Sequence, residues 1–311
     1  MMRDAVVFYS QFDDPVAWRR ALQAELPDLA FRVHPDVGDA EAVRYALTWK
    51  PPAGFFAAFP NLALVVNLGA GVDSLVARDD LPDVPISRLQ DDGMISLMTS
   101  YVLFSVLRYA RDIPAFERAQ RHREWHYIHP RPLSAVKVGV LGLGELGAAA
   151  ATALAHTGLD VTGWARTRKT IAGVRCLAGR DALDEVLAAN EIVVILLPLT
   201  PETRGLIGVR EIALTRPGAK LINAARGAVV DEAALIAALG TGHIAEATLD
   251  AFDVEPLPPA HPFWGMENVL ITPHLASITV PEQAARDVAE SIRRVRSGQA
   301  PLHAVDARRG Y

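Results

Sequence analysis

Short apolar runs alternate with longer amphipathic stretches along most of this chain. The runs are rich in Val, Ile and Phe, and this alternation is typical of repeated strand–helix units around a parallel sheet. It predicts strands over Ala5–Tyr9, Leu62–Asn67, Lys137–Leu141, Val161–Trp164, Glu191–Leu197, Ala219–Asn223, Ala247–Asp250 and Val269–Thr272. Since predicted helices follow most of these strands, we expect an α/β fold with doubly wound parallel sheets.

Three other segments bear on how the chain is divided into domains. Residues Arg111–Leu133 are charged, aromatic and proline-bearing, which predicts a long connection between two domains. The stretch Met94–Arg108 is apolar on more than one face, so it is either a buried helix bridging the domains or a helix whose outer face contacts another subunit. A helical period returns over Pro281–Arg296, although periodicity leaves open whether that helix packs on the first domain.

Composition narrows the class of protein. A chain of 311 residues with 22% charged residues and a net charge of -5 is long enough for two cores and lacks the basic field of a nucleic-acid or lipid binder. The single cysteine, Cys176, fits a reducing compartment, and we expect a cytoplasmic protein. We read no targeting segment, and the longest apolar stretch, Ile192–Leu199, is too short to span a membrane.

A glycine-rich turn joins a predicted strand to an alanine-rich helix in VGVLGLGELGAAAATALAHTG. Gly142 permits the tight turn, Gly144 lets backbone approach a pyrophosphate, and Gly147 lets the helix pack on the strand. A chance glycine-rich turn is the alternative, but the strand before it and the helix after it favour a dinucleotide site at the positive end of the helix.

The end of the next strand reads GWARTRK, and Ala165 stands where an acidic residue would bind the adenosine ribose of NAD. Arg166, Arg168 and Lys169 instead offer positive charge, and Thr167 offers a hydroxyl, to the 2′-phosphate of NADP. A solvated basic loop is the alternative interpretation. The position of these residues favours NADPH/NADP as cofactor, with NADH as a poorer substitute.

Three downstream blocks each place one ionisable residue near the carboxyl end of a predicted strand: Arg226 in LINAARGAVVDEAAL, Glu255 in LDAFDVEPLPP and His274 in VLITPHLAS. With these blocks in this order, the chain resembles the D-isomer-specific 2-hydroxyacid dehydrogenase family over nearly its whole length. TWKPP, LGAGVDS, GWARTRK, LLPLTPET, EPLPP and the terminal RGY resemble the glyoxylate/hydroxypyruvate reductase A branch more narrowly.

The resemblance implies the catalytic roles. His274 would donate a proton to the ketone oxygen, Glu255 would orient His274 and favour its charged form, and Arg226 would bind the substrate carboxylate and polarise the ketone. Backbone N–H groups around Ala70 and Gly71 would hold the carboxylate from the first domain, so the reaction would take place in a cleft between two Rossmann-like domains. Trp49 either lines the substrate pocket or packs in the first domain.

The resemblance also implies the domain limits and the wider site. We expect a discontinuous substrate-binding domain of residues 1–98 and 278–311 and an NAD(P)-binding domain of residues 99–277. The expected cofactor contacts are Gly142, Gly144, Glu145, Leu146, Gly147, Trp164, Ala165, Arg166, Thr167, Arg168, Lys169, Leu197, Pro198, Ala225 and Asp250, the last near the nicotinamide. The substrate contacts are Trp49, Ala70, Gly71, Arg226 and His274.

Neither a metal nor a macromolecular ligand is expected. His122, His126 and His129 lack a completing carboxylate or Cys set, so we expect no metal; Trp125 could reach an active site, even that of a neighbouring subunit. The prediction is a homodimeric reductase of glyoxylate and hydroxypyruvate that uses NADPH and binds no nucleic acid or membrane. Another small 2-keto acid, or a nucleotide-sensing co-repressor that retains the site, is the alternative.

Overall fold

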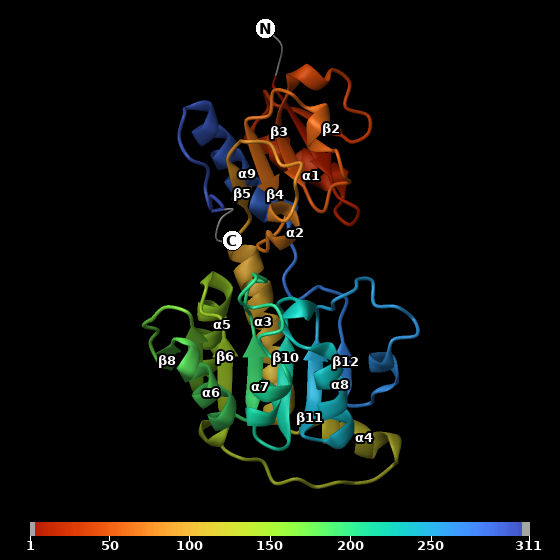
Figure 1. Ribbon diagram of the computed structural model, residues 1–311, viewed down its shortest axis with the longest axis vertical. Coiled ribbons are helices and arrows are strands. Elements are labelled where there is room, and N and C mark those ends of the chain that lie inside the picture. Colours follow the sequence, from red (N-terminus) through yellow and green to blue (C-terminus); the bar gives the residue numbers. More distant parts are fainter. Residues whose placement is uncertain (1–3, 307–311) are drawn as a thin grey trace. The chain divides into compact units, whose positions relative to one another are not determined.

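The computed structural model of the chain describes residues 4–306 (Figure 1). The described residues form two compact units: residues 4–94 with 278–306, and Ile95–Ser277. The first division falls within one helix, α3 (Asp92–Ala110).

The first unit contains a five-stranded parallel sheet with the strand order β2-β1-β3-β4-β5. The strands are β1 (Ala5–Tyr9), β2 (Ala30–Val33), β3 (Val43–Thr48), β4 (Leu64–Asn67) and β5 (Ile86–Arg88). The central strands are buried on both faces, which explains why β1 reads as an unbroken apolar run, AVVFY.

Three helices belong wholly to this unit: α1 (Pro15–Glu25), α2 (Asp73–Val76) and α9 (Pro281–Arg296). Two 3-10 turns, η1 (Ala40–Ala42) and η2 (Phe56–Ala58), complete it. Helix α9 packs on α1, so the helical period found near the end of the sequence serves the unit that begins the chain. The terminal RGY lies outside the described residues.

The second unit is built on a seven-stranded parallel sheet with the order β12-β11-β10-β9-β6-β7-β8. Its strands are β6 (Lys137–Leu141), β7 (Asp160–Ala165), β8 (Val174–Ala178), β9 (Ile192–Ile195), β10 (Ala219–Asn223), β11 (Ile244–Leu249) and β12 (Val269–Ile271). The chain leaves β6 toward β7 and returns to β9 on the other side of β6. This reversal is the point at which doubly wound sheets bind ligands, beyond the carboxyl ends of the strands.

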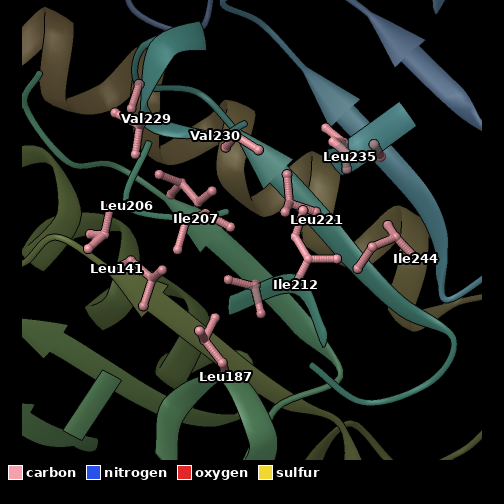
Figure 2. Close-up of a cluster of buried hydrophobic side chains, with 14 of the residues drawn as sticks. Leu141, Leu187, Leu206, Ile207, Ile212, Leu221, Val229, Val230, Leu235 and Ile244 are labelled. Atoms are coloured by element: carbon pink, nitrogen blue, oxygen red, sulfur yellow. The ribbon is translucent and has the colours of Figure 1, made fainter. Parts of the chain in front are cut away.

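Helices cover both faces of this sheet. They are α4 (Ile113–Arg121), α5 (Glu145–His156), α6 (Arg180–Ala189), α7 (Val209–Leu214), α8 (Glu232–Thr241) and most of α3, with 3-10 turns η3 (Leu133–Ala135), η4 (Gly227–Val229) and η5 (Pro262–Gly265). Successive strand residues divide between two cores: Val193 and Leu221 lie in one, and Val194 and Ile222 in the other. Figure 2 shows the first core, formed with α6, α7 and α8.

The predicted α/β class and doubly wound parallel sheets are confirmed, although four strands were missed. β2, β3, β5 and β8 each carry an Arg within a short run, at Arg32, Arg44, Arg88 and Arg175. Three of these strands lie at sheet edges, where a charged side chain can reach water. Their strand conformation depends on pairing with a neighbour, which the local sequence does not display.

The segment Arg111–Leu133 is not wholly a connection, because it contains helix α4. Asp112 takes a left-handed conformation (φ 54°) and turns the chain after α3, and Pro114 occupies the first turn of the new helix. Arg118 then reaches Glu246 on β11 at 2.5 Å. The charge of Arg118, which made the segment look irregular in sequence, thus forms an ion pair with a residue far along the chain.

Helix α3 is, within residues 4–306, the one helix long and apolar enough to cross a membrane by length and composition. A buried core helix passes the same test. Met98, Val102 and Val106 are buried in the second core of the Ile95–Ser277 unit, as expected for a core helix, whereas Phe104 on the same helix is 57% exposed.

Candidate active site

The three glycines after β6 meet three different geometric needs. Gly142 has φ +104°, and a Cβ there would lie 2.6 Å from the carbonyl oxygen of Leu196. A Cβ on Gly147 would lie 1.8 Å from the carbonyl oxygen of Gly142, so helix α5 can approach the turn only without a side chain. Gly144 is exposed, nothing lies within 4 Å of the Cβ position, and it is the N-cap of α5 without a side-chain cap. The backbone N–H groups of the first turn of α5 therefore face an open approach that suits a phosphate.

The second strand of the dinucleotide motif, β7, ends at Ala165. The side chains of Arg166, Thr167, Arg168 and Lys169 follow as exposed residues. Trp164 and Ala165 are buried, and the indole Nε1 of Trp164 donates to the carbonyl oxygen of Gly179 at 2.8 Å. Trp164 and Ala165 thus anchor the end of the strand, and the four polar side chains after them extend from that anchored end.

The loop after β9 lies beside Arg166. The pKa of Glu202 is lowered, mainly by a hydrogen bond from Thr200 and in smaller part by the positive charge of Arg166. In the same loop Leu197 is buried and Pro198 is exposed. Because β7 and β9 both run parallel to β6, loop 198–204 and the basic segment after β7 lie at the same end of the sheet.

The residue Arg226 belongs to a turn that Asn223 shapes. The Asn223 amide donates to the Arg226 carbonyl oxygen at 3.0 Å, and its side-chain oxygen accepts from Ala225 N at 3.1 Å. Arg226 is partly buried, and its Nη1 donates to the carbonyl oxygen of Ala225 at 2.8 Å. A buried amide at the end of β10 thus fixes the backbone from which the guanidinium extends.

Gly227 brings the Arg226 turn against the loop that follows β11. A Cβ on Gly227 would lie 2.1 Å from the carbonyl carbon of Phe252 and 2.2 Å from the backbone nitrogen of Asp253. Real Cβ atoms do not approach backbone so closely, so glycine is required for these two loops to touch. This contact ties the loop of Arg226 to the loop of Glu255.

Glu255 and His274 form a direct pair. The imidazole Nδ1 lies 2.9 Å and 3.0 Å from the two carboxylate oxygens, and Oε1 also accepts from Phe252 N at 3.0 Å. Since an ionised carboxylate can only accept, Nδ1 carries a proton and Nε2 is the ring nitrogen that faces away from Glu255. Both side chains are partly buried.

The backbone of His274 adopts φ +56°, a left-handed conformation uncommon for residues other than glycine. Buried Asp250, at the end of β11, holds the turn around it. Its carboxylate accepts from Thr272 Oγ1 at 2.6 Å, Leu275 N at 2.9 Å and Ala276 N at 2.9 Å. The hydrogen bonds of Asp250 thus bracket His274 from both sides.

In the first unit, the ring of Trp49 lies over the loop that contains Ala70 and Gly71. A Cβ on Gly69 would be 2.7 Å from the Trp49 ring, so the two are in close contact. The Asn67 amide donates to the carbonyl oxygens of Gly69 (2.9 Å) and Gly71 (3.0 Å) and so curves this loop. The loop and Trp49 therefore form one local surface.

The loop after Trp49 is held by an arginine that we did not predict. Arg78 donates to the carbonyl oxygens of Pro51 (2.6 Å) and Pro52 (2.8 Å) and to both carboxylate oxygens of Asp80 (2.7 Å and 2.6 Å). This bidentate ion pair is partly buried, which makes it stronger than an exposed pair. Sequence gave no signal for it, because an Arg two residues before an Asp is common on surfaces.

The histidines at 122, 126 and 129 are exposed, and Tyr127 shares a hydrogen bond of 3.0 Å with His129. Across the described ranges, no group of three or more His, Cys, Asp or Glu side chains is arranged to hold a metal ion.

Asn223, Gly227 and Thr272 also shape the site but were missed as site residues. A single polar residue or glycine beside a strand forms no sequence pattern.

The fold and the site define a class: a two-unit α/β protein with a dinucleotide-binding turn and a His–Glu pair beyond the strand ends. The family profile described as D-isomer specific 2-hydroxyacid dehydrogenase, NAD binding domain, matches residues 103–276. Together with full-length relatives above 30% identity, this match shows that the chain belongs to the D-isomer specific 2-hydroxyacid dehydrogenase family.

Particular relatives narrow the comparison. A glyoxylate/hydroxypyruvate reductase A from Yersinia enterocolitica is 38% identical, covering 98% of this chain and 99% of its own. A D-isomer specific 2-hydroxyacid dehydrogenase from Xanthobacter autotrophicus Py2, solved with NADPH and MES, is 61% identical with a TM-score of 0.96, covering 99% and 100%. The NADPH-dependent glyoxylate/hydroxypyruvate reductase of Sinorhizobium meliloti, solved with NADP and sulfate, is 33% identical with a TM-score of 0.93, covering 99% and 100%.

Proposed function

We propose that this protein is an NADPH-dependent reductase that converts glyoxylate to glycolate and hydroxypyruvate to D-glycerate. The observation that carries the proposal is the Glu255–His274 pair, tied through Gly227 to the turn of Arg226, in a member of this family. The names of the relatives from Yersinia and Sinorhizobium support the substrate class.

The residues present fit NADPH. The open approach at Gly144 leaves room for a pyrophosphate at the start of α5, and the strand after it ends in Ala165 rather than an acid. Arg166 is the main partner of the 2′-phosphate, with Thr167, Arg168 and Lys169 beside it. A charge-assisted contact contributes about 1.5–3 kcal/mol, so two such contacts favour NADPH over NADH by on the order of a hundredfold or more. The remaining cofactor contacts are those predicted from the sequence, including Asp250 near the nicotinamide.

The chemistry of the reduction follows from the side chains. NADPH, when bound, supplies a hydride to the keto carbon. His274 Nε2 gives a proton to the ketone oxygen, and Glu255 holds the ring through Nδ1 so that Nε2 faces the substrate. Arg226 binds the carboxylate and stabilises the negative charge that develops on the ketone oxygen. Proton donation, orientation of the proton donor and stabilisation of negative charge are thus divided among His274, Glu255 and Arg226.

Substrate size is set in the unit of residues 4–94 and 278–306, which we infer to be the substrate-binding domain. The Ala70–Gly71 backbone supplies N–H donors for the carboxylate, and the Trp49 ring over Gly69 lines the pocket. A bulky indole beside the carboxylate site favours 2-keto acids with a small side chain. The Ile95–Ser277 unit is correspondingly the NADPH-binding domain.

One assay tests the proposal. Purified protein is mixed with NADPH or NADH and, in parallel, with glyoxylate, hydroxypyruvate and pyruvate, and cofactor oxidation is followed by absorbance. We expect turnover of the first two acids with NADPH and higher kcat/KM with NADPH than with NADH. Absence of turnover with every 2-keto acid would refute the reductase and favour a nucleotide-sensing protein.

We further infer a cytoplasmic homodimer that binds the cofactor and a small 2-keto acid but neither nucleic acid nor a membrane. Trp125 is 99% exposed, Tyr127 74% and Phe104 57%, and a second copy would bury these rings. Light scattering after size-exclusion chromatography tests the assembly. We expect the parent protein to have the mass of two chains and the double variant Trp125→Ser/Tyr127→Ser to have the mass of one. A monomeric parent protein would contradict the inference.

A further inference from the structure

The turn that carries His274 is connected to a second layer of polar side chains. Tyr101, on α3, and Thr272, directly after β12, have their hydroxyl oxygens 2.7 Å apart. The Thr272 hydroxyl also contacts Asp250 Oδ1 at 2.6 Å, and the Thr272 carbonyl accepts from His274 N at 3.0 Å. Thr272 is thus bonded to Tyr101, Asp250 and His274.

The direction of these hydrogen bonds follows from proton counting. Asp250 is an acceptor, so the single hydroxyl proton of Thr272 points to Asp250 Oδ1. The Thr272 oxygen can then only accept from Tyr101, which makes Tyr101 the donor. Burial raises the pKa of Tyr101 to about 12, and the charge of Asp250 acts in the same direction, so the phenol keeps its proton at neutral pH.

We propose that Tyr101 and Thr272 are positioning residues that keep His274 in its left-handed, proton-donating conformation. They act through Asp250, whose remaining hydrogen bonds hold Leu275 N and Ala276 N on the far side of His274. The backbone strain at His274 is maintained by this set of contacts, as strained residues at reactive sites require. The inference rests on the proposed reductase activity, which makes His274 the proton donor.

The same helix offers a matched control. Tyr109 and Thr248 form an equivalent pair between α3 and β11, with their hydroxyl oxygens 2.6 Å apart, and both side chains are buried. Tyr109–Thr248 lies among core residues and is not bonded through Thr272 to the His274 turn. Loss of either pair removes one Tyr–Thr hydrogen bond, which is partly buried for Tyr101–Thr272 and buried for Tyr109–Thr248. Only loss of the Tyr101–Thr272 pair should displace His274.

The experiment compares Tyr101→Phe and Thr272→Val with Tyr109→Phe and Thr248→Val in the full-length protein. For the first pair we expect kcat with hydroxypyruvate to fall about tenfold, KM for NADPH to stay within about twofold, and the isotope effect from 4-deuterated NADPH to rise. Thr272→Ser keeps the hydroxyl and should restore kcat to within about twofold of the parent. The control pair should lower the melting temperature without lowering kcat.

A second readout does not depend on turnover. Amide hydrogen exchange of the cofactor-free protein should quicken at Leu275 and Ala276 in Tyr101→Phe and stay unchanged in Tyr109→Phe. Equal kcat losses in both pairs, no loss in either, or unchanged exchange at Leu275 and Ala276 would overturn the inference. A parent protein without reductase activity would instead refute the proposed function, while the exchange measurement would still report on the turn.

Discussion

Replacing Gly227 with Ala tests whether the contact between the Arg226 loop and the Glu255 loop is needed for catalysis. The new Cβ would lie 2.1 Å from the carbonyl carbon of Phe252, whereas ordinary contacts begin near 3.4 Å. The loops must therefore separate by about 1.3 Å, the difference between those two distances. Backbone atoms on the facing loop cannot rotate away as a side chain would.

A displacement of about 1 Å in an active site can cost about a hundredfold in rate. We therefore expect kcat/KM for hydroxypyruvate to fall about 100-fold in Gly227→Ala. Overpacking of this kind destabilises by about 1–3 kcal/mol, and the melting temperature should drop by roughly 2–10 °C. NADPH affinity should stay within a few-fold, because the glycine turn after β6 is untouched.

Steady-state kinetics, NADPH fluorescence titration and thermal denaturation measure these three effects. Gly240→Ala is the control, since Gly240 lies within α8 and nothing lies within 4 Å of its Cβ position. Alanine has a higher helix propensity than glycine, so this variant should be at least as stable as the parent protein, with normal kinetics. Unchanged kcat/KM in Gly227→Ala would refute the idea that the loop contact positions the reactive groups.

Three further substitutions probe other parts of the site. Arg166→Ala should lower kcat/KM with NADPH by about 10- to 100-fold and leave kcat/KM with NADH unchanged. The control is Arg175→Ala, which removes an exposed ion pair and should change kcat/KM with neither cofactor. Equal losses with both cofactors in Arg166→Ala would contradict the assignment of Arg166 to the 2′-phosphate. His274→Gln should lower kcat by about 10²–10⁴-fold with NADPH affinity intact, and near-normal turnover would remove His274 as proton donor. Arg78→Ala should free the loop after Trp49 and raise KM for hydroxypyruvate about tenfold without changing KM for NADPH, as initial-rate measurements would show.

The sequence was sufficient to predict those parts of the structure that neighbouring residues determine. β6 and β10 were predicted with their observed limits because each centres on apolar residues and is followed by a turn. The three-glycine turn was also readable, since Gly142 and Gly147 leave no room for a side chain and Gly144 leaves the approach to α5 open. The order of Arg226, Glu255 and His274 along the chain could be read, but their spatial relation could not.

What escaped prediction depends on contacts between distant residues. Gly227 meets Phe252 across two loops, and Tyr101 meets Thr272 across 171 positions of sequence. Edge strand β8 forms because β7 pairs with it, despite the exposed Arg175 within it. None of these features has a local period or spacing, because each is created only when the sheet assembles.

The most direct test of the proposed mechanism is a crystal structure of the protein with NADP and oxamate, an unreactive analogue of a 2-keto acid. We expect the oxamate carboxylate on Arg226, its carbonyl oxygen about 2.6–3.2 Å from His274 Nε2, and the 2′-phosphate on Arg166. Oxamate bound away from both Arg226 and His274, or a 2′-phosphate directed to solvent, would contradict it.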